Sequence, residues 1–286
     1  MKLIGLGEVL NQGISILLSR AAAVLSIRLA AVLAGMGVSV FGMRDFMLRV
    51  QQSARESKLE AESLGELLRQ LPPEQLMQAL SSPLLWAAVA ANILTILWAQ
   101  GAVYLALYPN LKTEPPAEAR GVFGAILGGL KLLFPLLLVN IIFGVLVTAG
   151  FIPLIGVSAW LYSRTGGPSA AMLLALPLVA PGLWLAVKFL LAPLVVAVEN
   201  RSAFSSLGRS SELAKGFWWP LFWRLALPLV LAIAGYWLLG RVPFVGGLLA
   251  AVVFPPFVNA CQLAILEDLR KIKHDTEPSG PAEEPA

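Results

Sequence analysis

Two residue types that carry much of the metal and nucleophile chemistry of proteins are nearly absent from this chain. It has one cysteine, Cys261, and one histidine, His274, among 286 residues. A single cysteine excludes an intramolecular disulfide and leaves no cysteine cluster for a metal. The single histidine sits in a polar, proline-rich stretch, which argues against a Ser-His catalytic pair and a histidine metal site. We therefore predict no catalytic residues, no metal and no cofactor, and a protein that is not an enzyme.

Charged residues are also scarce. They make up 13% of the chain, about half of the roughly 25% found in an ordinary soluble domain. Hydrophobic residues make up 58%, and the mean hydropathy is +0.78. Several apolar runs reach the roughly 20 residues that a membrane-crossing helix needs, whereas the alternation of membrane β-strands is missing. The composition therefore predicts a polytopic helical membrane protein.

The apolar runs predict an all-α fold with six transmembrane helices and interfacial amphipathic helices. The six-span membrane domain covers residues 21–266; an amphipathic helix over 1–20 precedes it, and a disordered tail over 267–286 follows it. The expected spans are about 21–43, about 84–108, one beginning near Leu132, one ending near Val198, about 220–240 and about 242–266.

The third and fourth apolar runs, residues 132–162 and 169–199, are longer than a bilayer requires. Each is about 46 Å long as a straight helix, so each has to tilt, kink or leave the membrane. Prolines are the usual cause of such breaks. The candidates are Pro153 in the third run and Pro177, Pro181 and Pro193 in the fourth.

The basic residues predict an orientation. With the N-terminus in the cytoplasm, 13 of the 21 lysines and arginines fall on the cytoplasmic side, seven fall outside, and Lys188 lies within a span. An excess of cations on the cytoplasmic side is the usual bias. We therefore predict a multi-pass protein of the cell (cytoplasmic) membrane with both termini cytoplasmic. This bias also accounts for the net charge of +4, so we expect membrane lipids as partners and no nucleic acid.

The outer loop, residues 44–82, looks helical. Lys58 and Glu62 are spaced as ion-pair partners on a helix, and a proline followed by Glu74 suits a helix start. A solvated helical hairpin resting on the spans is the first interpretation. A binding surface for another membrane protein is the second.

The polar segment 200–217 is predicted to be a cytoplasmic amphipathic helix at the membrane surface. Its less polar positions recur at spacings of three and four: Phe204, Leu207, Ser211, Ala214 and Trp218. The candidate interfacial lipid contacts are Arg201, Arg209, Lys215, Trp218 and Trp219. Similar segments precede the first and third spans, at residues 3–17 and 117–131. An interfacial segment thus leads into a membrane hairpin three times. Whether the chain is an internal threefold repeat is left open by the irregular spacing of the three segments.

Lys188 is the cation that we expect well inside a span. It lies 11 residues before Glu199, about 16 Å along a straight helix, and a lysine at that depth is costly. It is expected to face a polar cluster with Asn92, Gln100 and Asn140. Three roles stay open: structural pairing with these amides, snorkelling toward lipid phosphates, and handling of a lipid or another anion.

One stretch resembles a known family. Residues 183–223, LWLAVKFLLAPLVVAVENRSAFSSLGRSSELAKGFWWPLFW, are similar to bacterial membrane proteins related to the membrane domain of some glycerophosphodiester phosphodiesterases. The matching positions are Lys188, Pro193, Glu199, Ser210 or Ser211, Lys215, Gly216 and Trp218. The resemblance implies a six-span fold more than an activity, since many members have no known function. The phosphodiesterase domain, which relies on paired histidines and carboxylates, is absent.

Three classes of function remain at this stage. The first is an integral membrane protein without a catalytic site, either an accessory factor of the cell envelope or a protein that contacts lipids. The second is a transporter or lipid mover that uses the proline-broken third and fourth spans around Lys188. A membrane enzyme comes third. No acidic residue lies well inside a span, which counts against proton- or cation-coupled carriers.

Overall fold

A computed structural model describes residues 3–57, 63–108, 122–165, 176–242 and 245–276. Within these ranges the regular secondary structure is helical throughout, without strands. Six segments are long and apolar enough to cross a membrane: Ala21–Glu56, Pro83–Leu107, Leu133–Leu161, Val179–Glu199, Trp218–Leu239 and Val245–Lys273. The predictions of an all-α fold and of a multi-pass membrane protein are therefore confirmed.

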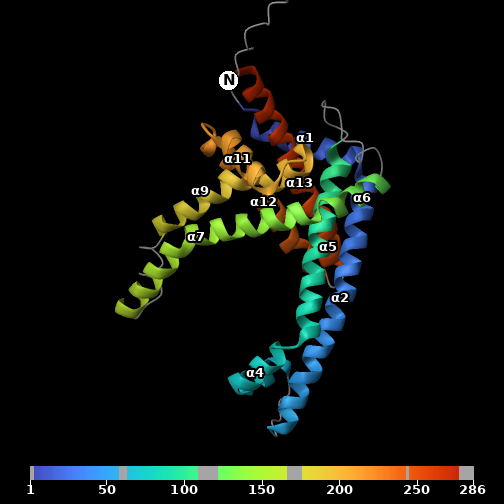
Figure 1. The fold of residues 1–286 in the computed structure, drawn as a ribbon, viewed down its shortest axis with the longest axis vertical. Helices are drawn as coiled ribbons and strands as arrows, with labels where there is room; N and C mark the ends of the chain where they lie inside the picture. Colours follow the sequence, from blue (N-terminus) through green and yellow to red (C-terminus); the bar gives the residue numbers. More distant parts are fainter. Residues whose placement is uncertain (1–2, 58–62, 109–121, 166–175, 243–244, 277–286) are drawn as a thin grey trace, which may run out of the picture.

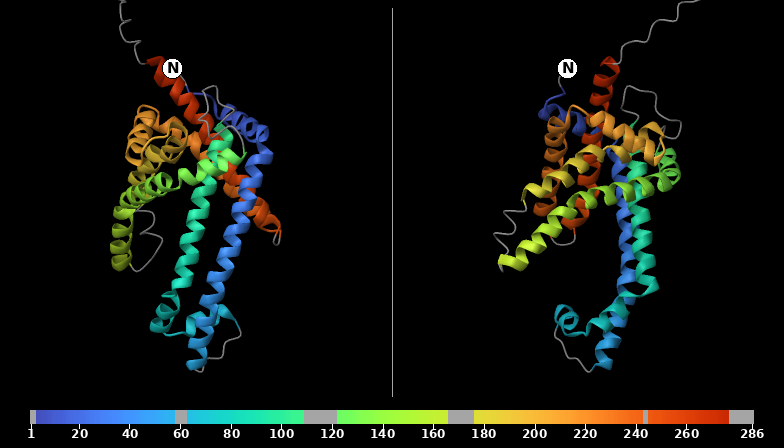
Figure 2. Two further views of the ribbon diagram at one scale, coloured as in Figure 1. Left: turned by 45° about the vertical axis from the view of Figure 1, so that its right-hand side comes forward. Right: turned by 60° about the vertical axis from the view of Figure 1, so that its left-hand side comes forward.

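The long helices form three antiparallel pairs. Helices α2 (Ala21–Glu56) and α5 (Pro83–Leu107) lie side by side along the long axis of the molecule (Figures 1 and 2). Helix α7 (Leu133–Thr165) pairs with α9 (Val179–Phe189), and this pair extends away from α2 and α5 at a wide angle. Helices α12 (Trp218–Leu239) and α13 (Val245–Thr276) form the third pair.

A shorter helix precedes each pair. These helices are α1 (Leu6–Ser19), α6 (Val122–Lys131) and α11 (Ala203–Ala214). All three gather at the end of the molecule where the described N-terminus and the end of α13 lie (Figure 1). The structure thus has the expected order of a short helix followed by a hairpin, three times over, and it puts the three short helices at one level.

The prolines of the third and fourth spans have different effects. Pro153 lies inside α7, which continues as one helix but bends in its later part (Figures 1 and 2). The fourth span is interrupted at Leu190 and Leu191, and Pro193 lies in the first turn of the following helix, α10 (Ala192–Glu199). A first turn tolerates proline because its N–H groups have no helical partner. The expected break is therefore seen in the fourth span, whereas the third is bent.

The helices of the outer loop lie at the opposite end of the molecule. Helices α3 (Leu64–Gln70) and α4 (Pro73–Leu80) rest on α2 through a small apolar cluster of Val50, Leu71 and Ala79. This packing agrees with a helical hairpin resting on the spans. The expected pair of Lys58 and Glu62 lies outside the described residues.

Part of the expected tail is helical. Residues 267–276 continue α13, although the sequence favoured a disordered tail from residue 267. Leu269 is fully buried and Ile272 is 7% exposed. Asp268 accepts a hydrogen bond from the backbone N–H of Ile4 at 2.9 Å. The helix therefore extends because this part of it packs into the core and binds the N-terminal segment.

Arg224 of α12 fixes the start of the chain. It donates hydrogen bonds to the backbone carbonyls of Ile4 at 2.6 Å and Leu3 at 3.0 Å. Gly13 of α1 packs against Cys261 of α13, and a Cβ atom at Gly13 would come within 2.5 Å of the Cys261 sulfur. The larger apolar side chains Ile14 and Leu18, one turn apart, stay exposed on another face of α1. This leaves an apolar face free to meet lipid, as expected for an interfacial helix.

Candidate functional site

Helix α11 packs on the rest of the protein through small residues. Its buried residues include Ser206, Leu207 and Ser210, while Phe204 is 70% exposed. The sequence analysis placed Phe204 and Leu207 on one lipid-facing stripe. The structure divides them, because α9, α10 and α7 cover the face that contains Leu207. Phe204 alone of this pair remains free to contact lipid.

Lys188 lies beside α11 rather than far below it. The hydroxyl of Ser210 donates a hydrogen bond to the backbone carbonyl of Lys188 at 2.9 Å. The interruption at Leu190 and Leu191 ends α9 just after Lys188, and α11 folds back against both α9 and α10. The chain turns twice between Lys188 and Lys215, which brings α11 beside Lys188, and the depth of about 16 Å expected between Glu199 and Lys188 along a straight helix stays a prediction.

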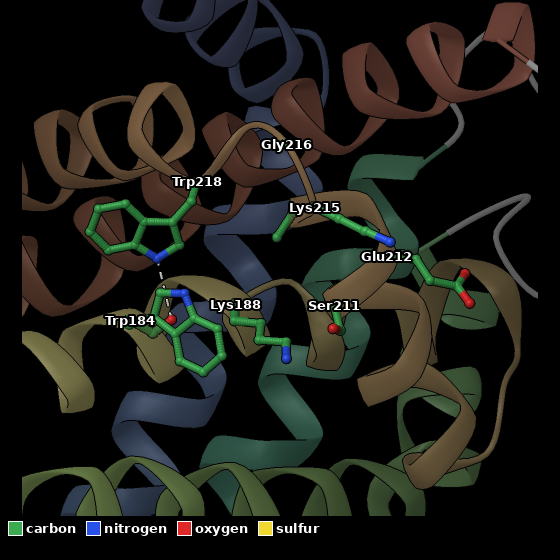
Figure 3. A pocket seen from close by; sticks show the side chains of 8 residues that line it. Trp184, Lys188, Ser211, Glu212, Lys215, Gly216 and Trp218 are labelled. Carbon is green, nitrogen blue, oxygen red and sulfur yellow. Dashed lines mark hydrogen bonds between the residues drawn. The ribbon is translucent and has the colours of Figure 1, made fainter.

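A cavity of about 530 Å³ lies between α9, α11 and the start of α12. Its polar lining includes Lys188, Ser211 and Lys215, and the indole rings of Trp184 and Trp218 form its apolar walls. Figure 3 shows the Lys188 side chain extending toward Ser211, while the Lys215 side chain extends toward Glu212. The cavity volume falls within the range of about 300–1,000 Å³ usual for small-molecule sites.

Aromatic rings hold the Lys188 side chain. Its ammonium lies 4.6 Å from the centroid of the Trp184 ring and 5.3 Å from that of Phe189. The indole N–H of Trp218 points to the backbone carbonyl of Trp184 at 3.4 Å (Figure 3). Ring faces attract a cation without neutralising it. The two rings thus hold the Lys188 side chain beside the cavity.

The cavity carries an excess of positive charge. Within the described ranges no carboxylate lies within salt-bridge distance of Lys188 or Lys215. Glu212 lies at the rim, but its carboxylate is 3.5 Å from Arg209 and its side chain is 70% exposed. The cavity thus has two lysines without a carboxylate partner among the described residues and one glutamate, Glu212, whose charge is partly neutralised by Arg209. This net positive charge favours an anionic ligand.

Glu199 forms a second charged centre next to the cavity. Its two carboxylate oxygens lie 2.8 Å from Arg270, 2.7 Å from Arg201 and 3.8 Å from Arg209. Its side chain is 11% exposed. Asn200, in the left-handed conformation at φ 49°, ends α10 and turns the chain into α11. This centre ties α10, α11 and α13 together, so two of the arginines expected to contact lipid have an internal partner.

The three amides expected around Lys188 have other partners. Asn92 donates to the Ser39 hydroxyl at 2.7 Å, Gln100 donates to the Tyr104 hydroxyl at 2.9 Å, and Asn140 donates to the Leu136 carbonyl at 2.7 Å. None of the hydrogen bonds among the described residues joins an amide of this group to the Lys188 ammonium. These three amides thus form their hydrogen bonds within their own helix or hairpin, and Lys188 is not required as a partner.

Trp184 was not expected at the site, and Ser210 was named only as a position of the family motif. Trp184, four residues before Lys188, forms a wall of the cavity, and Ser210 fixes α11 to the end of α9. The spacing of four between Trp184 and Lys188 puts both on one helix face, and this signal could have indicated a cation–π pair. Of the expected lipid contacts, Lys215 and Trp218 line the cavity, and Trp219 is 57% exposed.

No family model, curated protein or solved structure matches this chain. The similarity of residues 183–223 to the membrane domain of glycerophosphodiester phosphodiesterases therefore stays a prediction. Its motif positions Lys188, Ser211, Lys215, Gly216 and Trp218 all line the cavity.

Proposed function

We propose that this protein is a non-enzymatic membrane protein that binds the anionic headgroup of a phospholipid in the cavity between α9, α11 and α12. The observation that carries the proposal is a cavity of about 530 Å³ that is lined by two lysines, Lys188 and Lys215, and by two tryptophans, Trp184 and Trp218. Ammonium groups bind phosphate as point charges, and indole rings prefer the boundary between hydrocarbon and water.

The position of the cavity supports a lipid rather than a soluble anion. The cavity lies on the end of the molecule where the short helices α1, α6 and α11 gather (Figure 1). Next to it α12 begins with exposed tryptophans, of which Trp219 and Trp223 are 57% and 52% exposed. A headgroup in the cavity would place its acyl chains against this aromatic, membrane-facing surface.

We further propose that the protein resides in the cell membrane with both termini and the cavity on the cytoplasmic side. The cation excess supports this orientation. The headgroup would then belong to a lipid of the cytoplasmic leaflet, where anionic lipids are enriched.

The substitution Lys188→Met tests the proposal, because methionine keeps the length of the side chain and removes its charge. The amides Asn92, Gln100 and Asn140 are hydrogen-bonded elsewhere, so the fold is expected to survive. Phosphatidylglycerol retained on the purified protein should fall at least about tenfold at this site, since the loss of one charged hydrogen bond costs about 1.5–3 kcal/mol. Native mass spectrometry in a mild detergent measures the retained lipid.

Two further variants control this experiment. Lys188→Arg should restore much of the binding because it restores the charge, although its fork geometry differs from that of an ammonium. Lys131→Met removes a cation of α6 that lies outside the cavity and should leave phosphatidylglycerol unchanged. Equal lipid retention by wild type and Lys188→Met would end the proposal.

A lipid mover is the second candidate function. The observation in its favour is the interruption of the fourth span at Leu190 and Leu191, directly after Lys188. Broken membrane helices commonly border the transport sites of carriers. Transfer of a fluorescent anionic lipid between leaflets of proteoliposomes, compared with empty liposomes, distinguishes a mover from a protein that only binds.

A further inference from the structure

A long groove follows the face shared by α2 and α5, away from the cavity at Lys188. Two adjoining hollows of about 460 and 280 Å³ form it, and both are lined by Ser39, Asn92 and Ile96. The groove begins at Arg28 and reaches Met43. This distance is about 22 Å along α2, longer than half of a hydrocarbon core of about 30 Å.

Arg28 is the one cation in the described lining of this groove. Its Nη2 donates a long hydrogen bond of 3.4 Å to the Ala251 carbonyl, and its Nε is buried without a hydrogen-bond partner. No carboxylate of the described ranges lies within salt-bridge distance of it. A guanidinium has five N–H donors, and one of them, on Nη2, has a hydrogen-bond partner among the described residues; the donors left for a ligand are those on the two Nη atoms, because Nε is enclosed by protein atoms.

Arg28 lies near the end of α2 that adjoins α1. Arg28 lies eight residues after Arg20, where α1 passes into α2, about 12 Å along the helix. Side chains of a helix lean toward its N-terminus, so Arg28 leans toward the end where α1 lies. Long cationic side chains snorkel toward the phosphates of the nearer leaflet, so a lipid phosphate on the α1 side of the groove is the anion that Arg28 can reach.

Small residues leave space for an acyl chain beyond Arg28. Ala31 and Gly35 are buried one and two turns farther along α2. Met36 and Val40, which also line the groove, are 56% and 63% exposed. A lipid whose phosphate lies at Arg28 can therefore extend one acyl chain along this apolar lining toward Ser39.

We propose that the groove between α2 and α5 is a second lipid site, which binds an anionic phospholipid with its phosphate on Arg28 and one acyl chain along the groove. The charge is complementary, because a buried guanidinium without a carboxylate partner binds a phosphate through paired N–H groups. The site shares no described lining residue with the cavity at Lys188.

The experiment counts phosphatidylglycerol molecules retained by the full-length protein in detergent, at a collision energy that removes phosphatidylcholine. Wild type should retain two, Arg28→Met and Lys188→Met one each, and the double variant none. Loss of a lipid in Arg28→Met alone would support this site while ending the proposal for the cavity. Loss of a lipid in Lys188→Met alone would support the proposal for the cavity and overturn the proposal for this groove.

Met36→Trp tests the groove without removing its charge. Met36 is 56% exposed, so the larger side chain is tolerated by the fold and fills the space for the acyl chain. One phosphatidylglycerol should be lost, as in Arg28→Met, and Arg28→Lys should retain part of the binding. Full retention of both lipids by Met36→Trp, or by a folded Arg28→Met, would overturn the proposal.

Competition identifies the source of the anion. With Lys188→Met protein, which isolates the groove, phosphatidylglycerol should displace a spin-labelled anionic phospholipid, whereas inorganic phosphate should not. Displacement by inorganic phosphate would show a free-anion site and overturn the assignment of a lipid. Displacement by oleate at lower concentration than phosphatidylglycerol would overturn it in favour of a fatty acid.

Discussion

Glu199 shows at the scale of single residues how the candidate site is held in place. Its carboxylate lies within 4 Å of arginines from three places: Arg270 on α13, Arg209 on α11, and Arg201 just before α11. The side chain is 11% exposed, so water screens these attractions weakly. Without this carboxylate, three cations would face one another near the end of α10.

Glu199→Gln should therefore lower the free energy of unfolding by about 3 kcal/mol, in the range found when one member of a buried ion pair is removed. Thermal unfolding in detergent, followed by circular dichroism, measures the loss. Glu212→Gln is the matched control, because its side chain is 70% exposed and its contact with Arg209 is 3.5 Å. Exposed pairs contribute up to about 1 kcal/mol. Equal melting temperatures for the two variants would contradict this assignment.

At the scale of helices, close contacts between backbones fix the arrangement of α5 and α6. A Cβ atom at Gly129 would lie 2.8 Å from the Ala102 nitrogen and 2.9 Å from the Trp98 carbonyl oxygen. The Trp98 indole also donates a hydrogen bond to the Ile126 carbonyl at 3.0 Å. The glycines of this segment thus serve helix packing, as membrane interfaces rich in small residues generally do.

Gly129→Val should force α6 away from α5, because both neighbouring atoms belong to the backbone and cannot rotate aside. Overpacking of this kind costs about 1–3 kcal/mol, which thermal unfolding in detergent would show. Gly144→Val, in α7, is the control, since a Cβ atom at Gly144 has no neighbour within 4 Å. A Gly129→Val protein as stable as the control would refute the close packing of α5 and α6.

At the scale of the whole molecule, the two ends of the long hairpin α2–α5 are chemically different. One end has α1, α6, α11 and the cavity, and the other has α3 and α4 (Figure 1). If the long helices cross the membrane, positions 63 and 205 must be on opposite sides of it. Both serines are exposed, whereas the neighbouring Ser206 is fully buried and is unsuitable for labelling.

Cysteines at positions 63 and 205, introduced one at a time into a Cys261→Ala background, test this topology. A membrane-impermeant maleimide added to intact cells should label position 63, and position 205 should react after the membrane is permeabilised. Cys261 is itself buried, so its removal is a precaution against background labelling. Labelling of both positions from the outside of intact cells would contradict the six-span arrangement.

The class of fold follows from local features of the sequence. Apolar runs of the right length predict helices in a membrane whatever their partners, because an unpaired backbone group in hydrocarbon is too costly. The three short helices that precede the hairpins could also be predicted, because amphipathic periodicity is a local property of the sequence. Lys188 could also be singled out, since a cation within an apolar run is rare.

The residues that surround Lys188, in contrast, depend on how the helices pack, which no local pattern in the sequence reveals. Its expected partners Asn92, Gln100 and Asn140 are bonded elsewhere, and Trp184, Ser211 and Lys215 border the cavity with it. The turn at Leu190–Leu191 and the left-handed Asn200 fold α11 back against α9, and no count of residues along a straight helix anticipates this. These two breaks change the direction of the chain and so set the neighbours of every residue that follows. The new directions depend on packing between helices that are distant in sequence.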